Sequence, residues 1–398
     1  MRPILAPLML CMVLPLGAQT RARGRDLGVP FPGTPGPLNA ITDVAGVEVG
    51  HTTIIRGEGK LVRGQGPVRT GVTAILPRGK NSDDNVMAAW FTLNGNGEMT
   101  GTTWVEESGF LGGPVMITNT HSVGIVHDAV IEWIVKRGKE FDWSLPVVAE
   151  TWDGTLNDIN GFHVTKEHAF AALEGASGGA VAEGNVGGGT GMMCHGFKGG
   201  IGTSSRKVSP GGWTVGVLVQ CNYGGRRQLR IAGTPWSSVP EAGQPLPCYT
   251  IDPPPNARFG RCGGPPPREE PEELGSIIIV VATDAPLLPH QLKRLVKRAS
   301  LGIGRMGGIG GNSSGDIFVA FTTANPRSDV ESGTATLQML ANNAVSGLFE
   351  ATIDATEEAI LNAMLAATDL TGADGLRVPA LPHAMVVELL RKHSRLSR

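Results

Sequence analysis

The junction between Gly275 and Ser276 is where the sequence offers its most specific chemistry. Residues 240–275 are dominated by proline, glycine and charge, whereas residues 276–283 form an apolar, β-branched run typical of a buried strand. If the peptide bond before Ser276 broke, its hydroxyl would be a nucleophile and its freed α-amine a general base, since an α-amine has a pKa of about 8. Gly275 suits such a cleavage because it lacks a Cβ atom. The alternative is that Ser276 merely begins a strand.

Three short motifs suggest other chemistries, but their surroundings fit them poorly. Residues 302–307 match G-x-G-x-x-G, yet they follow a predicted helix instead of a strand, so we expect a flexible turn there and no nucleotide site. Residues 311–315 match G-x-S-x-G around Ser313, but a nucleophile elbow joins a strand to a helix and this segment leads into a strand. Residues 204–207 match S-x-x-K in a region crowded by glycine and proline. The sequence has no H-E-x-x-H and no C-x-x-C motif, so it predicts neither a metal site nor a cofactor.

The composition of the 398-residue chain is that of a folded protein. Hydrophobic residues make up 41% and charged residues 18%, which excludes general disorder. A net charge of -2 gives no strong field for nucleic acid or an anionic membrane. The 57 glycines indicate many tight turns and close backbone approaches.

The first residues are typical of a secretory signal. Arg2 precedes an apolar stretch over residues 4–16, and small residues follow at Gly17 and Ala18. We therefore expect a signal peptide over residues 1–18 and export of the protein, although Leu16 matches the cleavage pattern poorly and a frayed terminus is the alternative. Neither this stretch nor any later one is long enough to span a membrane.

Periodicity predicts an α+β fold in which helices cover long antiparallel strands. Strands are predicted at residues 40–56, 72–76, 147–150, 213–220, 276–283 and 316–322. Helices are predicted at residues 124–136, 167–173, 290–299, 357–366 and 384–391. The composition of residues 240–275 predicts an exposed, partly extended loop without a core. Cys248 and Cys262 flank its proline-rich part, and they either form a disulfide in an oxidising compartment or remain two free thiols.

Longer segments make the sequence recognisable. They are residues 25–34, 39–44, 95–102, 117–124, 148–158, 186–192, 275–276, 282–286 and 310–317. With these segments the chain resembles the self-processing serine aminopeptidases, a group that includes L-aminopeptidase/D-Ala-esterase/amidase and the β-peptidyl aminopeptidases, and the likeness extends from Arg25 to His383. The resemblance implies a four-layer α/β/β/α sandwich, similar to the N-terminal-nucleophile hydrolases but with different connectivity. It also implies one structural domain over residues 19–398, cleaved into a large chain of residues 19–275 and a small chain of residues 276–398.

The resemblance also implies roles for individual residues. Ser276 matches the family nucleophile, and the Gly275–Ser276 bond matches the autoproteolytic site. Ser314 and Asp316 match a serine and an acidic residue that would hydrogen-bond the Ser276 amine and tune its proton affinity. Asn222 matches a donor to the oxyanion of the transition state.

Two further residues would contact the substrate. Glu150 matches an acidic residue that receives the free ammonium group of the substrate, which a confined carboxylate recognises well. The alternative is an ordinary carboxylate at a strand end. Trp152 stands where some members of the group have a tyrosine, and an indole has no hydroxyl to offer. This departure leaves Asn222 and backbone amides to bind the oxyanion, and it assigns Trp152 to a wall of the pocket.

The expected function is that of a self-cleaving aminopeptidase. It would release N-terminal amino acids from small peptides, amides or esters through an acyl-enzyme on Ser276, without a cofactor, a metal or a nucleic-acid partner. The resemblance further implies a homotetramer, in which each of the four units is one pair of large and small chains. Two alternatives stay open: a serine hydrolase with Ser313 as nucleophile and His383 as base, and a non-enzymatic, glycine-rich binding protein. A related acetyltransferase group shares the architecture but uses a threonine nucleophile, and Ser276 argues against that reaction.

Overall fold

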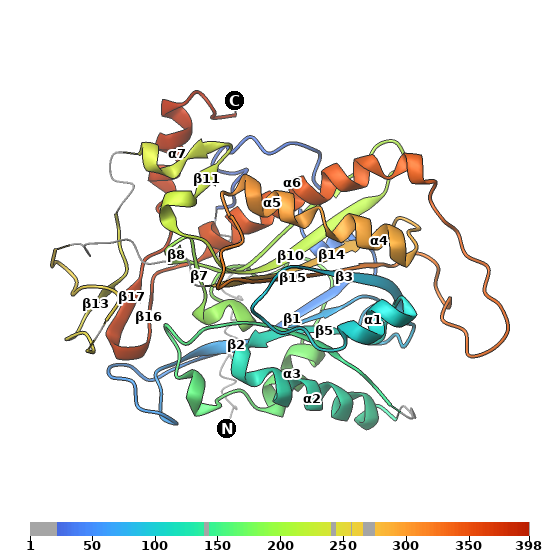
Figure 1. The fold of residues 1–398 in the computed structure, drawn as a ribbon, viewed down its shortest axis with the longest axis horizontal. Helices are drawn as coiled ribbons and strands as arrows, with labels where there is room; N and C mark the ends of the chain where they lie inside the picture. Colours follow the sequence, from blue (N-terminus) through green and yellow to red (C-terminus); the bar gives the residue numbers. More distant parts are fainter. Residues whose placement is uncertain (1–21, 139–142, 240–243, 256, 266–274, 398) are drawn as a thin grey trace, which may run out of the picture.

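The computed structural model describes residues 22–138, 143–239, 244–255, 257–265 and 275–397, and its main body has four layers (Figure 1). Two β-sheets lie face to face in the middle, and helices cover the outer face of each. This is the predicted α/β/β/α sandwich. The predicted signal peptide, residues 1–18, lies outside the described residues.

The smaller sheet has the strand order β1-β2-β5-β6. Neighbouring strands are antiparallel except β5 and β6, which run parallel. Two helices pack on its outer face, α2 (Val123–Lys136) and α3 (Lys166–Glu174), through apolar residues such as Val126 and Ala172. The strands are β1 (Glu48–Arg56), β2 (Val68–Leu76), β5 (Val115–Asn119) and β6 (Val147–Thr151).

The larger sheet has the strand order β4-β3-β15-β14-β10-β9. Its two central strands, β15 and β14, are parallel, and the other neighbours are antiparallel. Three helices cover its outer face, α4 (Pro289–Val296), α5 (Ala299–Arg305) and α6 (Ser346–Ala366). The strands are β3 (Val86–Gly95), β4 (Phe110–Leu111), β9 (Gly200–Lys207), β10 (Thr214–Asn222), β14 (Ser276–Thr283) and β15 (Gly315–Thr322).

Strand β14 is buried on both faces, which explains its unbroken apolar sequence. Ile277 and Ile279 point to the helices, whereas Ile278 and Val280 point to the smaller sheet. The core between the sheets also contains Ile117 and other apolar side chains from β2, β5 and β6. The prediction of a buried strand over residues 276–283 is confirmed residue for residue.

Smaller elements surround this sandwich (Figure 1). Two are helices, α1 (Thr102–Ser108) and α7 (His383–Lys392). A three-stranded sheet has the order β13 (Cys248–Tyr249), β17 (Leu376–Val378) and β16 (Leu370–Thr371). Two hairpins pair β7 (Met193–Cys194) with β8 (Phe197–Lys198) and β11 (Arg230–Ile231) with β12 (Thr234–Pro235). Among the described residues, no helix is both long and apolar enough to cross a membrane.

Two predictions of secondary structure are wrong in part. Residues 40–56 do not form a strand throughout, because a 3-10 helix occupies Ile41–Asp43 and β1 starts at Glu48. The carboxylate of Asp43 accepts the backbone N–H groups of Leu38 and Ala40 and so stabilises a turn there.

The helix predicted over residues 290–299 corresponds to α4, which ends three residues earlier, at Val296, and a second helix, α5, follows from Ala299. Helix α5 contains the first glycines of the motif at residues 302–307, where we predicted a flexible turn. A Cβ atom on Gly302 would lie 2.5 Å from the Cβ atom of Thr356, so this glycine permits close packing of α5 on α6.

The prediction that residues 240–275 contribute no core is also wrong for the described part of that segment. Tyr249 and Phe259 are buried in a small cluster with Leu156, Leu376 and Val378. A disulfide joins Cys248 to Cys262, the alternative that the sequence left open. A second disulfide joins Cys194 to Cys221, which the sequence analysis did not assign.

Candidate active site

Ser276, the predicted nucleophile, is the first residue of β14 and lies between β10 and β15. Asn222 is its direct partner on the antiparallel strand β10, and Gly315 is its partner on the parallel strand β15. The backbone N–H group of Gly315 donates a hydrogen bond to Oγ of Ser276 at 3.2 Å. Directly opposed residues on antiparallel strands share a face, with Cβ atoms about 5 Å apart. The Ser276 hydroxyl and the Asn222 amide therefore face the same side of the sheet.

Gly275 is pressed against the backbone of β10. A Cβ atom on Gly275 would overlap the carbonyl oxygen of Asn222 and lie 3.1 Å from Cα of Tyr223. Because these neighbours are backbone atoms, they cannot turn aside as a side chain would. The position before Ser276 thus requires glycine, for a reason that the sequence alone does not reveal.

Ser314 and Asp316 flank Gly315 and are both buried. Oγ of Ser314 donates a hydrogen bond of 2.7 Å to Oδ1 of Asp316. A β-bulge in the pairing of β15 with β3 follows directly, between Asp316 and Ile317. Bulges re-aim side chains near sites of this kind. The register of β14 and β15 brings this pair beside Ser276, despite the long sequence separation.

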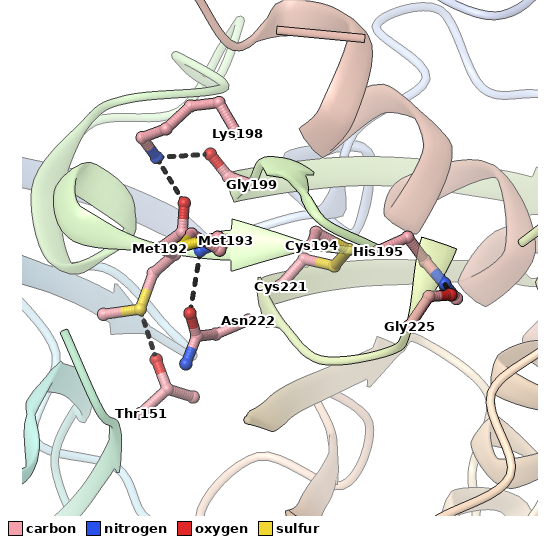
Figure 2. Close-up of a disulfide and its surroundings, with 10 residues drawn as sticks. All are labelled: Thr151, Met192, Met193, Cys194, His195, Lys198, Gly199, Cys221, Asn222 and Gly225. Atoms are coloured by element: carbon pink, nitrogen blue, oxygen red, sulfur yellow. Dashed lines mark hydrogen bonds between the residues drawn. A yellow bond between two sulfur atoms is a disulfide. The ribbon is translucent and has the colours of Figure 1, made fainter. Parts of the chain in front are cut away.

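Asn222, the last residue of β10, is held at both ends of its amide, and Figure 2 shows the contact of its Oδ1 atom with the Met193 backbone. Its Oδ1 atom accepts the backbone N–H of Met193 at 2.8 Å, and its Nδ2 atom donates to the carbonyl oxygen of Trp152 at 2.9 Å. The two contacts fix which end of the amide carries the donor. One of the two Nδ2 protons is used by Trp152, and the other is available in principle to an oxyanion.

Glu150 is a buried carboxylate near the end of β6. Its Oε1 atom accepts the backbone N–H of Glu98 at 3.0 Å, and its Oε2 atom accepts the hydroxyl of Thr120. Burial raises the pKa of the Glu150 carboxyl above its ordinary value, although these hydrogen bonds oppose the shift. Only 3% of the residue is exposed, unlike an ordinary carboxylate at a strand end.

Gly97 separates this carboxylate from the Ser276–Gly315 pair. A Cβ atom on Gly97 would lie 3.2 Å from Oε1 of Glu150 and 3.3 Å from Cα of Gly315. The Glu150 carboxylate and Gly315, the strand partner of Ser276, thus both lie close to the point where a side chain on Gly97 would begin. A small molecule with an ammonium group at one end and a carbonyl carbon nearby could contact both.

Trp152 contributes its backbone to the site, and its side chain lies at the surface. The carbonyl group contacts Asn222, while the residue is 44% exposed and its ring lies against Gly154. The indole therefore does not stand in for the hydroxyl of a tyrosine in these contacts. A role as a pocket wall stays a prediction.

Ser313, the alternative nucleophile, does not lie at the strand-to-helix turn that a nucleophile elbow requires. Ser313 is in the connection from α5 to β15, a helix-to-strand link, and its carbonyl group accepts a hydrogen bond from the Asn96 amide at 2.7 Å. His383, its suggested base, begins α7, and its Nε2 atom lies 2.9 Å from the carbonyl oxygen of Leu365. Among the described residues, no cluster of histidine, cysteine and acidic side chains could hold a metal ion.

Several residues of the site escaped the sequence analysis. Gly315 and Met193 act through backbone N–H groups, which every sequence position except proline carries. Gly97 and Thr120 lie in segments that resemble the family, but nothing in their residue types indicates a contact with Glu150. Such contacts depend on the tertiary fold.

Comparisons with known proteins show the family to which the chain belongs. The model of peptidase family S58 matches residues 39–378. Two curated relatives are both β-peptidyl aminopeptidases named BapA. The one from Sphingosinicella microcystinivorans is 56% identical over 94% of this chain and 93% of its own, and the one from Sphingosinicella xenopeptidilytica is 46% identical over 97% and 96%.

A solved structure has the same fold. The L-aminopeptidase D-Ala-esterase/amidase of Ochrobactrum anthropi is described as a prototype of the serine aminopeptidases and a new variant of the Ntn hydrolase fold. It superposes with a TM-score of 0.82 at 47% identity, covering 94% of this chain and 99% of that one. The family match, the curated relatives and the shared fold agree with one another. The chain therefore belongs to peptidase family S58 and is a hydrolase of the aminopeptidase class.

Proposed function

We propose that the chain cleaves itself between Gly275 and Ser276 and then acts as an aminopeptidase with an N-terminal serine nucleophile. One observation carries the proposal: Ser276 is the first residue of a buried central strand, with Asn222 directly opposite and the Gly315 N–H group on its hydroxyl. Gly275 supports it, because the glycine lets this peptide bond lie against β10.

The self-cleavage begins with an attack of the Ser276 hydroxyl on the carbonyl carbon of Gly275. The C–N bond breaks, the nitrogen takes up the hydroxyl proton, and an ester joins the two residues. Water then hydrolyses the ester to a Gly275 carboxylate and a free Ser276 hydroxyl. In the continuous chain the Ser276 nitrogen is an amide without basicity, whereas the product carries an α-amine with a pKa of about 8. Cleavage thus creates the base on the residue that bears the nucleophile.

In each turnover the Ser276 amine removes the hydroxyl proton as the oxygen attacks the substrate carbonyl. The negative charge that develops on the carbonyl oxygen is stabilised by the second Nδ2 proton of Asn222, and such a donor contributes about 3–4 kcal/mol. The protonated amine passes its proton to the leaving group, and water hydrolyses the acyl-enzyme. The Ser314–Asp316 pair would hold the new amine and set its proton affinity, since a carboxylate favours the ammonium form.

The substrate would enter with its free ammonium group on Glu150 and its carbonyl carbon at Ser276, and Trp152 would wall the entrance. We further propose that it is an N-terminal β-amino acid residue, because two relatives that cover most of this chain are named β-peptidyl aminopeptidases. A β-amino acid carries one more methylene between its amine and its carbonyl than an α-amino acid. The separation of Glu150 from Ser276 would therefore decide between the two classes. Amides and esters of such residues are the expected simple substrates.

The assembly and location are proposals as well. Residues 19–275 and 276–398 would be the large and small chains of one domain, four such pairs would form the homotetramer, and residues 1–18 would be removed on export. The two disulfides support an oxidising compartment, since structural disulfides are rare in cytosolic proteins.

A matched pair of serine variants tests the proposal. Ser276→Ala is expected to remain one chain and to lose turnover, whereas Ser313→Ala is expected to split and to keep its activity. Turnover is followed with p-nitroanilides of a β-amino acid, of its L-α counterpart and of its D-α counterpart. An active Ser276→Ala variant would overturn the mechanism, and faster hydrolysis of an α-amino substrate would overturn the proposed substrate class.

A further inference from the structure

We propose that Lys198 is a positioning residue for Asn222: its buried side chain fixes the backbone segment whose N–H group orients the Asn222 amide. This inference rests on the proposed function, in which Asn222 stabilises the oxyanion. Lys198 lies in the neighbouring hairpin of β7 and β8, so it would act on the reaction only through another residue (Figure 2).

The hairpin places Lys198 directly opposite Met193. These two residues are partners in the antiparallel pair of β7 and β8, and the next partners are Cys194 and Phe197. Two residues form the turn, His195 with φ 49° and Gly196 with φ 70°. Two successive positive φ angles are typical of the tight turn that suits a two-residue hairpin. The pairing therefore fixes how Lys198 lies relative to the Met193 N–H group, which donates to Asn222.

Lys198 is a buried amine that has no acidic partner among the described residues. The residue is completely buried, and none of the ion pairs found among the described residues includes it. Its Nζ atom donates instead to three backbone carbonyl groups, those of Met192 at 2.6 Å, Gly199 at 2.8 Å and Gly189 at 3.4 Å. Burial lowers the pKa of the Lys198 amine from 10.5 to about 7. Its ammonium form has three donors, and these carbonyls accept all of them. Burying a charge is costly unless hydrogen bonds compensate, so such a lysine needs a specific reason.

The Lys198 side chain contacts Met192, the residue directly before Met193, whose N–H group donates to Asn222. The Met192 carbonyl accepts both the Lys198 ammonium and the Gly199 N–H group, and this carbonyl belongs to the same peptide unit as the Met193 N–H. Since a peptide unit is planar, holding its oxygen also holds the direction of its N–H. Lys198 therefore aims the N–H group that Oδ1 of Asn222 accepts.

The opposite end of the hairpin is anchored independently. The disulfide between Cys194 and Cys221 joins the neighbour of Met193 to the neighbour of Asn222. The backbone N–H of His195 donates to the Tyr223 carbonyl at 2.8 Å, and its Nδ1 atom lies 3.1 Å from the Gly225 carbonyl oxygen. With the tip fixed in this way, the direction of the peptide before Met193 depends on the two groups that its carbonyl oxygen accepts, the Lys198 side chain (Figure 2) and the Gly199 N–H group.

Loss of the Lys198 side chain would disturb the transition state more than substrate binding. Only the Gly199 N–H group would then hold the Met192 carbonyl, so the Met193 peptide could rotate and its N–H group would no longer orient the Asn222 amide. Misplacement of a catalytic group by about 1 Å costs on the order of 100-fold in rate. Glu150 is held by Glu98 and Thr120 instead, so binding of the substrate amine would persist.

A double-mutant cycle separates this role from a purely structural one. Lys198→Met removes the donors, Asn222→Ala removes the amide, and the third variant carries both changes. All are measured on processed enzyme, with active sites counted by a serine-reactive probe. We expect Lys198→Met to lower kcat by about 100-fold with KM changed less than about threefold. In the Asn222→Ala background the same change should lower kcat by less than about threefold, because the residue to be positioned is gone.

Lys207→Met is the matched control. Lys207 ends the next strand, β9, is exposed, and donates to the hydroxyl of Thr214 at 2.7 Å, so its loss should leave kcat unchanged. If Lys198→Met fails to fold, Lys198→Gln replaces it in the cycle. That variant keeps two N–H donors on a shorter side chain and should also lower kcat non-additively with Asn222→Ala.

The outcomes distinguish the two proposals. Equal losses of kcat in both backgrounds, or a rise in KM alone, would overturn the positioning role and leave the proposed function intact. A nearly normal kcat in Asn222→Ala would overturn the oxyanion role of Asn222, and the inference about Lys198 would fail with it.

Discussion

Replacing Gly275 with alanine tests whether the fold is built for self-cleavage at this bond. The added methyl group would overlap the Asn222 carbonyl oxygen and lie 2.9 Å from its carbonyl carbon. A methyl carbon and a carbonyl oxygen normally stay about 3.3 Å or more apart. The backbone would therefore have to separate by on the order of 1 Å, which would move the Gly275 carbonyl away from the Ser276 hydroxyl. A displacement of that size lowers the rate of a positioned reaction by roughly 100-fold.

The assay follows the loss of full-length chain by intact mass spectrometry after synthesis is stopped. Gly260→Ala is the matched control in the same connecting segment, because among the described residues a Cβ atom there would lie near only the Pro265 carbonyl oxygen, at an ordinary 3.4 Å. We expect Gly275→Ala to split about 100 times more slowly than Gly260→Ala. Those Gly275→Ala molecules that do split should turn over substrate normally, because the residue leaves the reaction after cleavage. Equal splitting rates in the two variants would refute the steric argument.

Three further predictions concern the substrate side and the buried acids. Gly97→Ala places a methyl group 3.2 Å from Oε1 of Glu150 and 3.3 Å from Cα of Gly315, where it would crowd the substrate amine. KM should therefore rise more than kcat falls in steady-state kinetics. An unchanged KM would contradict this prediction. Burial raises the pKa of Glu150, so the carboxylate takes up its proton at a higher pH than an ordinary glutamate, and kcat/KM should begin to fall at that higher pH as the solution is acidified. Glu150→Gln should have a high KM and should not show this fall. A pH profile identical to that of the unchanged enzyme would remove Glu150 from amine binding. Burial raises the pKa of Asp153 from 3.8 to about 7, so between these pH values the folded state keeps a proton that the unfolded state releases. The free energy of unfolding should therefore fall as pH rises from about 4 to 7. Denaturant titrations should show a smaller fall for Asp153→Asn, and an equal fall in both proteins would contradict the raised pKa of Asp153.

The part of the fold with strong local signals was predictable from the sequence. The run of β-branched residues after Ser276 is typical of a buried strand, and β14 spans the predicted residues 276–283. Helix α2 follows the apolar spacing that the sequence shows over residues 124–136. Helix α6 begins at Ser346, eleven residues before the predicted start. Its buried Leu348, Ala351 and Ala355 have helical spacing, but a glycine directly before them and two β-branched residues between them weaken the local helical signal.

The candidate site was predictable only as a set of residues, through their resemblance to a family. Ser276, Asn222, Ser314, Asp316 and Glu150 carry recognisable chemistry, and the strand register brings the first four together. The roles themselves stay predictions. The sequence could not have shown how these residues are held, since their partners are mostly backbone groups.

Two other features required the tertiary structure. Cys194 and Cys221 are 27 residues apart, and only the approach of β7 to the end of β10 makes them neighbours. The segment around Tyr249 looked unable to pack because of its prolines and glycines, but it borrows its apolar partners from β17, more than 100 residues later. In both cases the decisive contacts are long-range ones that local composition does not encode.

The most direct test of the central claim is intact mass spectrometry of the purified protein combined with N-terminal sequencing. We predict two polypeptides, the smaller beginning with Ser276, and aminopeptidase activity that appears in step with their formation. Full activity in a sample that contains only uncut chain would contradict the claim that Ser276 works with its own α-amine.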